Sequence, residues 1–184
     1  KGLSHLNQRK LIAVNKDIFK DDTIRLLRAV RLSEFLNLEI DNQTTKQIRE
    51  DSKLIQNCAP ERVHDELMAI MSFDFGSMNA INQLNNLGLL FNLIPELKLG
   101  VSEEQPKEHY WDIFEHNVQT VGYFENIINS NNIDDWILDQ IYWDSQLKDY
   151  FMNQSISGYS RYSVVKLACL LHDIGKPHTK TVDN

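Results

Sequence analysis

Two short clusters of ionisable side chains have the types and spacing that chemistry needs. The first is Asp21-Asp22-x-x-Arg25, where a carboxylate and a guanidinium lie three residues apart. On a helix such residues share one face, and together they place a hydrogen-bond acceptor beside a fork of donors. That combination suits the Watson–Crick edge of a nucleobase. A simpler interpretation is that Asp22 only caps the helix and pairs with Arg25.

The second cluster is the His172-Asp173 step, which follows an apolar run and precedes Ile174-Gly175-Lys176-Pro177. Together with His116 from an earlier segment, it offers two imidazole nitrogens and a carboxylate oxygen, which are ligands for a divalent ion. Lys176 is a candidate phosphate ligand, although an exposed lysine in a loop usually binds nothing specific. The alternative is that His172 is a core histidine bonded to the backbone and Asp173 a turn former.

The elements that must position these clusters are helices. Apolar residues recur at helical spacing along most of the chain, and strand-like alternation never exceeds a few residues, so the predicted fold class is all-α. We expect one helix over about residues 22–36 with an Asp as its N-cap. Asp41 should cap the next helix, and Pro60 should open a third. The run from Val164 to Leu171 predicts a buried helix directly before His172.

The polar stretch over residues 100–108 contains Gly100 and Pro106 and predicts a domain boundary. We therefore expect one domain over residues 1–100 and another over residues 101–184. Cys58 and Cys169 form no close pair, so both are expected to be buried reduced thiols.

Charge and hydropathy narrow the function classes. The net charge of −7 argues against a protein that simply coats nucleic acid. The first 31 residues, however, hold 8 positive and 3 negative side chains, so a nucleotide or polyanion would prefer that end. A solvated basic helix face would explain the same pattern. The 184 residues contain no membrane-length apolar run and no signal-peptide pattern at the start, which predicts a cytoplasmic protein without a membrane partner.

The first cluster has neighbours that resemble a known family. The sequence continues as Leu27-Arg28-Ala29-x-Arg31, and later reads Pro60-Glu61-Arg62-x-x-Asp65-Glu66-Leu67. This combination resembles the neck of class II tRNA nucleotidyltransferases, the CCA-adding enzymes, and of bacterial poly(A) polymerases. The resemblance implies that residues 1–100 form a neck and body domain that selects ATP or CTP and binds the tRNA 3′ end.

By resemblance, the individual residues receive roles. Asp22 and Arg25 fall on the two base-reading positions, and Asp21 stands where the family often has Glu. Arg62 and Glu66 fall on the later neck motif that braces the site, and basic residues of the first 31 meet phosphates. The implied nucleotide-binding set is Asp21, Asp22, Arg25, Arg28, Arg31, Arg62 and Glu66. If Asp22 and Arg25 were buried with no open space before them, the base-reading hypothesis would fail.

The family's head domain carries a Gly-Ser turn and a D-x-D pair that hold the catalytic Mg²⁺ ions, and the chain contains no D-x-D. We therefore expect a piece of a longer enzyme, without catalytic residues for nucleotidyl transfer and inactive in that reaction alone. Whether the parent adds CCA, CC, A or a poly(A) tail is left open, as is the oligomeric state.

The second cluster resembles the HD superfamily, whose pattern is H…HD…D. By resemblance His116, His172 and Asp173 are the metal ligands, and the final Asp of the pattern is missing. The resemblance implies a truncated HD domain over residues 101–184 with a weak divalent-metal site, in a parent enzyme that hydrolyses cyclic or simple phosphoesters. Two alternatives remain: a stand-alone HD phosphohydrolase with a helical extension, and a non-enzymatic helical binding module.

Overall fold

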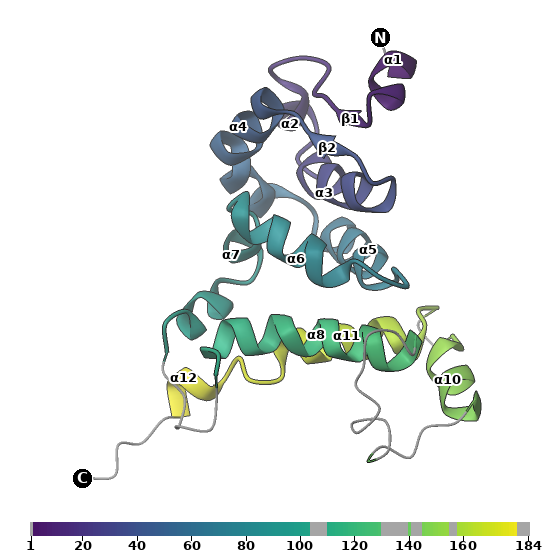
Figure 1. The fold of residues 1–184 in the computed structure, drawn as a ribbon. Helices are drawn as coiled ribbons and strands as arrows, with labels where there is room; N and C mark the ends of the chain where they lie inside the picture. Colours follow the sequence, from purple (N-terminus) through teal and green to yellow (C-terminus); the bar gives the residue numbers. More distant parts are fainter. Residues whose placement is uncertain (1, 104–109, 130–139, 141–144, 155–157, 180–184) are drawn as a thin grey trace. The chain divides into compact units, whose positions relative to one another are not determined.

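The computed structural model describes residues 2–103, 110–129, 140, 145–154 and 158–179. Within these ranges the regular secondary structure is helical apart from one pair of two-residue strands and one isolated bridge, so the predicted all-α class is confirmed (Figure 1). No helix in this part of the chain is both long and apolar enough to cross a bilayer. Contacts divide the protein into a first unit, Lys1–Ile70 with Asn79–Pro95, and a second unit, Met71–Met78 with Glu96–Asn184.

The first unit is built from short helices around an apolar centre. Leu26, Leu27 and Val30 from one helix are fully buried in it, as are Ile48 and Ile70. Strands β1 (Lys10–Leu11) and β2 (Glu39–Ile40) pair in parallel. The helices are α1 (Gly2–Asn7), α2 (Ile18–Asp21), α3 (Arg25–Phe35), α4 (Asn42–Asp51), η1 (Ser52–Asn57), α5 (Pro60–Met71), α6 (Ser77–Asn86) and α7 (Leu90–Leu93).

Two of the predicted helix starts are confirmed. The Asp41 carboxylate accepts from the backbone N–H groups of Gln43 and Thr44 at the start of α4, and α5 begins at Pro60. The predicted Asp cap on α3 is wrong, because its N-cap is Ile24 and no side chain caps it. Asp22 instead ends α2 with an extended backbone, which turns its carboxylate toward a partner elsewhere in the unit.

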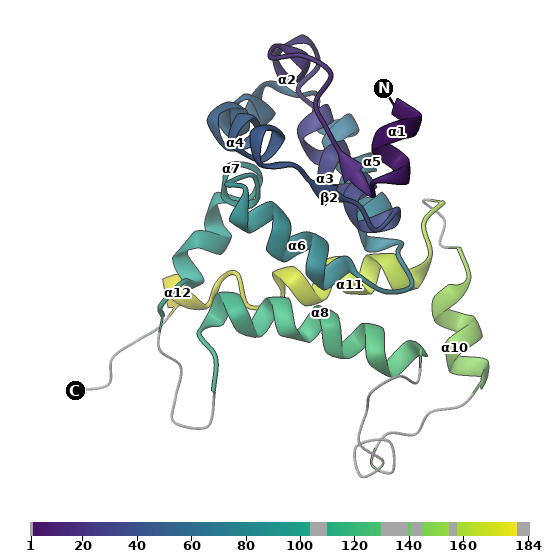
Figure 2. The same cartoon turned by 45° about the horizontal axis from the view of Figure 1, so that its top comes forward.

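The second unit is centred on two helices that lie side by side, α8 (Ile113–Asn129) and α11 (Arg161–Leu171) (Figures 1 and 2). Its other elements are η2 (Pro95–Gly100), α10 (Ser145–Met152) and α12 (Lys176–Thr179). A close packing point lies at Gly122 of α8, where a Cβ would meet the Met78 sulfur at 2.5 Å. The predicted boundary at residues 100–108 lies partly outside the described residues and stays a prediction.

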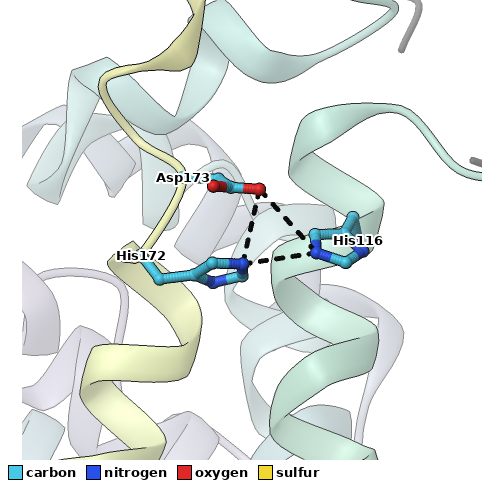
Figure 3. Close-up of side chains that lie close together, drawn as sticks. All are labelled: His116, His172 and Asp173. Atoms are coloured by element: carbon cyan, nitrogen blue, oxygen red, sulfur yellow. Dashed lines mark hydrogen bonds and ion pairs between the residues drawn. The ribbon is translucent and has the colours of Figure 1, made fainter. Parts of the chain in front are cut away.

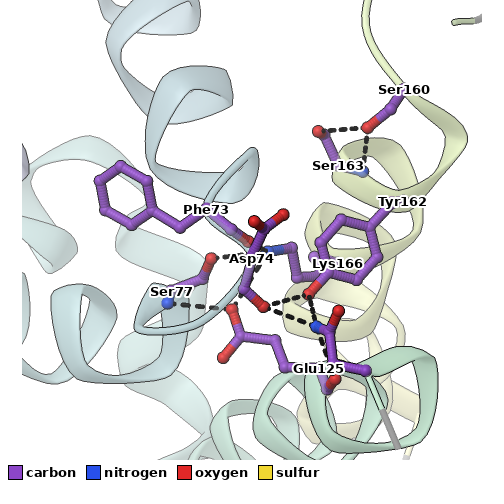
Figure 4. A network of polar contacts seen from close by, with 9 residues as sticks. Phe73, Asp74, Ser77, Glu125, Ser160, Tyr162, Ser163 and Lys166 are labelled. Carbon is purple, nitrogen blue, oxygen red and sulfur yellow. Dashed lines mark hydrogen bonds and ion pairs between the residues drawn. The ribbon is translucent and has the colours of Figure 1, made fainter. Parts of the chain in front are cut away.

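Helix α11 forms before His172 as predicted, but the expected burial of its apolar residues is only partly confirmed, because Leu170 is buried whereas Val164 and Ala168 are exposed. Val164 is 43% exposed, whereas Lys166 is 0% exposed. Figure 4 shows why a buried ammonium is tolerated. Lys166 Nζ donates to Phe73 O at 2.6 Å, to Ser77 Oγ at 2.8 Å and to Glu125 Oε1 at 3.1 Å. All three donors of the ammonium are therefore satisfied inside the second unit.

Main-chain groups of the turn before α6 and of its first residue form further hydrogen bonds with side chains of the second unit. Tyr162 Oη and Asn129 Nδ2 each donate to Asp74 O at 2.8 Å, and the Ser77 N–H donates to Glu125 Oε1 at 3.0 Å. Burial lowers the pKa of Lys166 to about 8, although the Glu125 charge opposes that shift. The network thus fixes a turn by its main-chain atoms.

Candidate functional site

The Asp22 carboxylate is held by a guanidinium from α5. Arg62 Nη1 lies 2.9 Å from Oδ1, and Nη2 donates to Oδ2 at 3.1 Å. Two parallel bonds of this kind fix both the position and the plane of a carboxylate. Arg25, on the first turn of α3, has its Nε 3.8 Å from Oδ2 and donates through Nη1 to Ile18 O at 3.3 Å. The carboxylate and the Arg25 guanidinium are therefore held side by side.

The electrostatics of this pair keep the acid charged. The Arg62 hydrogen bond, helped by its charge, lowers the pKa of Asp22, and Asp22 in turn raises the pKa of Arg62. An ionised carboxylate only accepts hydrogen bonds. Asp22 therefore presents acceptors at neutral pH and cannot switch to a donor.

Accessibility is the condition on which the base-reading hypothesis depends. The side chain of Asp22 is 24% exposed and that of Arg25 is 39% exposed, so neither is buried against the rest of the chain. Arg25 also lines an open hollow of about 260 Å³ whose walls are otherwise mostly apolar. Its lining residues are Leu11, Ile12, Ala13, Val14, Ile18, Phe19, Arg25, Arg28, Ala29 and Leu32.

A second carboxylate holds the next two arginines of α3. Buried Glu66 accepts from Arg28 Nε through Oε1 at 2.9 Å and from Arg31 Nε through Oε2 at 2.6 Å. Arg28 and Arg31 lie one helical turn apart, so a single acid orients both. Each arginine uses only its Nε here, and the terminal nitrogens of both guanidinium groups lie outside these two bonds.

Six of the seven predicted nucleotide-site residues thus take part in two ion clusters, one around Asp22 at the end of α2 and one around Glu66 of α5, and both include arginines of α3. The exception is Asp21, which ends α2, is exposed and takes part in none of the ion pairs described above. The direct bond between Arg62 and Asp22 was not foreseen. Its only sequence signal is the Pro60 helix start, which places Arg62 in the first turn of α5.

The second candidate site joins α8 to the end of α11. His116 Nε2 and His172 Nε2 lie 3.2 Å apart, and Asp173 Oδ2 lies 3.3 Å from His172 Nε2 and 3.7 Å from His116 Nε2 (Figure 3). Ligand atoms that share one ion at bond lengths of about 2.1 Å are separated by roughly 3.0–3.5 Å. All three predicted metal-ligand residues therefore lie together with approximately that spacing.

The local bonds also favour metal ligation. His172 Nδ1 lies 2.8 Å from Cys169 O, and an Nδ1–H that donates to this carbonyl leaves the Nε2 lone pair facing His116 and Asp173. Backbone carbonyls orient metal-binding imidazoles in this way. Two nitrogens and one oxygen form a donor set that suits a first-row divalent ion, and no other part of the described chain gathers three such residues.

A lysine completes this cluster. Lys176 Nζ lies 2.6 Å from Asp173 Oδ2, the oxygen that both imidazoles face. The side chain of Asp173 is 12% exposed and that of Lys176 is 45% exposed, so a nearly buried acid is paired with a half-exposed cation. From the sequence, Lys176 was expected only as a phosphate ligand, and its contact with Asp173 was not predicted.

Comparison with known proteins supports the predicted family. Residues 37–99 match the family model described as "Probable RNA and SrmB-binding site of polymerase A". The A-adding tRNA nucleotidyltransferase of Deinococcus radiodurans is 29% identical over 183 residues, which is 97% of this chain and 35% of that protein. The CCA-adding enzyme of Lactococcus lactis is 35% identical over 68 residues, or 36% of this chain and 17% of that protein. The chain is therefore similar to tRNA nucleotidyltransferases over nearly its whole length.

The similarity extends to the fold and covers only part of the relatives' length. A solved structure of a tRNA-processing enzyme complex superposes over the whole chain and 61% of its own chain with a TM-score of 0.54 at 12% identity, which shows a shared fold. The chain spans about a third of the length of the Deinococcus relative.

Proposed function

We propose that the first unit selects the incoming nucleotide and binds the tRNA 3′ end in a tRNA nucleotidyltransferase, with Asp22 and Arg25 reading the base. The single observation that carries this proposal is the two-bond contact of Arg62 with Asp22, which leaves an ionised acceptor fixed beside the exposed Arg25 guanidinium. An ordinary surface pair of Asp22 and Arg25 would not require a third residue, Arg62, to fix the carboxylate.

The chemistry follows from the donors and acceptors of the bases. Cytosine and adenine both carry an exocyclic amine next to an unprotonated ring nitrogen, so Asp22 can accept from the amine while Arg25 donates to the ring. Uracil and guanine place a carbonyl oxygen and a ring N–H at these positions. A carbonyl oxygen facing the Asp22 carboxylate is repelled, and the ring N–H facing Arg25 leaves two donors opposed with no acceptor between them. One acid and one arginine can therefore accept CTP and ATP and reject UTP and GTP.

The remaining arginines suit the charged part of the ligand. Arg28 and Arg31 are held by Glu66 through Nε alone, and a guanidinium fork can bind phosphate oxygens with its other N–H groups. The hollow beside Arg25 and Arg28 offers apolar contact area to a base or ribose. Most of residues 37–99, which match the RNA-binding family model, belong to the first unit, to which we assign tRNA contact.

The test uses the full-length enzyme and tRNAs that end before CCA and before A. In Asp22→Ala and Arg25→Ala we expect the preference for CTP and ATP over UTP and GTP to fall about 100-fold. Asp17→Asn and Arg49→Met, exposed substitutions in the same unit, serve as matched controls and should keep that preference. An unchanged preference in both site variants would remove the base-reading role. The products on the two tRNAs distinguish C, CC, A and CCA addition.

A second candidate function rests on the geometry of His116, His172 and Asp173. We propose that these residues hold a divalent ion, which would supply Lewis acidity for hydrolysis of a phosphoester. Oriented by Cys169 O, the His172 ring would present Nε2 to the ion, and Asp173 would contribute Oδ2. Calorimetric titration with Mn²⁺ should show binding that His172→Ala abolishes and that His64→Ala, an exposed histidine of the first unit, leaves unchanged.

A further inference from the structure

We propose that Lys176 is an internal counter-ion of the triad: its ammonium occupies Asp173 Oδ2 and must leave before a divalent ion can bind, so it sets the affinity of the site. This inference rests on the proposed metal site and adds a residue outside the ligand set. It makes Lys176 a positioning residue that acts through Asp173.

The first support is the arrangement around one oxygen atom. Asp173 Oδ2 lies 3.3 Å from His172 Nε2 and 3.7 Å from His116 Nε2, but only 2.6 Å from Lys176 Nζ. The ammonium is therefore the closest charged group to the oxygen that a metal would use. A metal ion and an ammonium repel each other strongly at such a distance, so the two cations compete for Oδ2.

The second support is the turn that delivers the lysine. Lys176 N–H donates to Asp173 O at 3.0 Å, which closes a turn directly after the ligand. Lys176 is also the first residue of α12. The contact follows from local backbone geometry and from a spacing of three residues, so it does not depend on a chance approach of a distant side chain.

The third support is the difference in exposure between the two partners. Asp173 is nearly buried, and a buried carboxylate is costly without a compensating charge. Lys176 is half exposed, and its four-carbon stem can carry the ammonium back into water at little cost. Asp173 Oδ2 accepts no hydrogen bond, so the Lys176 ammonium compensates it by charge when no ion is bound and can withdraw when an ion of higher charge arrives.

The test measures Mn²⁺ binding to the whole chain by calorimetry. We expect Lys176→Met to bind Mn²⁺ at least about tenfold more tightly than the wild-type chain, because one competing positive charge is gone. Lys98→Met, an exposed lysine of the same unit, is the matched control and should bind as the wild type does. His172→Ala should abolish binding in the presence or absence of Lys176.

The outcomes separate the two proposals. Equal or weaker Mn²⁺ binding in Lys176→Met, with binding that still depends on His172, overturns the counter-ion role and leaves the metal site standing. If neither the wild-type chain nor Lys176→Met binds more tightly than His172→Ala, the metal site itself is refuted. Because Lys176 is half exposed, its substitution should leave the helical circular-dichroism signal unchanged, which checks that folding is intact.

Discussion

One region of the molecule holds the ion clusters around Asp22 and Glu66, and another holds the network around Lys166. Both contain carboxylates and cationic side chains, but they differ in accessibility. In the first, four arginines face two carboxylates and the central pair is partly exposed. In the second, one ammonium faces one carboxylate, and Lys166 is fully buried with all its donors used. An accessible surplus of donors can bind a ligand, whereas a closed and balanced network can only hold structure.

This contrast predicts that substitutions in the closed network act mainly on stability. Lys166→Met should lower the free energy of unfolding by about 3–5 kcal/mol, because it leaves Glu125 buried and unpaired. The double substitution Lys166→Met with Glu125→Met should recover much of that loss, since both buried charges are gone. Urea unfolding monitored by circular dichroism measures both, with Lys98→Met as the control. A double variant as unstable as the single one would contradict this account.

The pH dependence of stability should sharpen the same contrast. The pKa of Lys166 is lowered from its ordinary 10.5 to about 8 in the folded chain, so between these values the unfolded chain binds more protons. Stability from this group is therefore reduced below about pH 8 and rises as the pH increases above it. We expect the wild type to gain roughly 1–3 kcal/mol over Lys166→Met across that window.

The measurement compares urea unfolding of the two chains at pH 7.5, just below the window, and at pH 8.5 and 9.5, inside it. Tyr162, whose pKa is raised mainly by burial, is present in both chains and so largely cancels in the comparison. A stability difference that does not change with pH would show that Lys166 does not titrate in this range.

The open cluster should respond in the opposite way. Arg62→Met removes the two bonds that hold Asp22, but Asp22 is partly exposed, so no buried charge loses its partner. The midpoint of urea unfolding should therefore change little. The preference for CTP and ATP should nevertheless fall about tenfold in the full-length enzyme, because the acceptor is no longer held in one plane. Arg49→Met is the matched control. A large loss of stability with unchanged base preference would assign Arg62 to structure alone.

Sequence patterns predicted those features that depend on neighbours in the chain. Asp41 and Pro60 mark the starts of α4 and α5 because caps and first-turn prolines act within a few residues. The His116, His172 and Asp173 triad was also predicted, although His116 lies 56 residues before His172, because the resemblance to the H…HD…D pattern links these distant positions.

Contacts with distant partners that belong to no recognised motif were missed. Asp22 does not cap α3 because Arg62, 40 residues away, takes its carboxylate. Lys166 received no role in the predicted helix from Val164 to Leu171, and only Glu125 and the turn before α6 make its burial favourable. Local sequence propensity does not indicate which of several possible partners a side chain binds when only the tertiary fold brings those partners close.

The contact between Gly122 and Met78 has a consequence for how this protein can vary. A methyl group at position 122 would meet the Met78 sulfur at 2.5 Å, but a thioether on an unbranched chain can rotate aside. Alanine at 122 should therefore be acceptable only together with a rearranged or shorter residue at 78. In a library randomised at both positions, the surviving clones should show paired choices, with bulk gained at one position offset by bulk lost at the other.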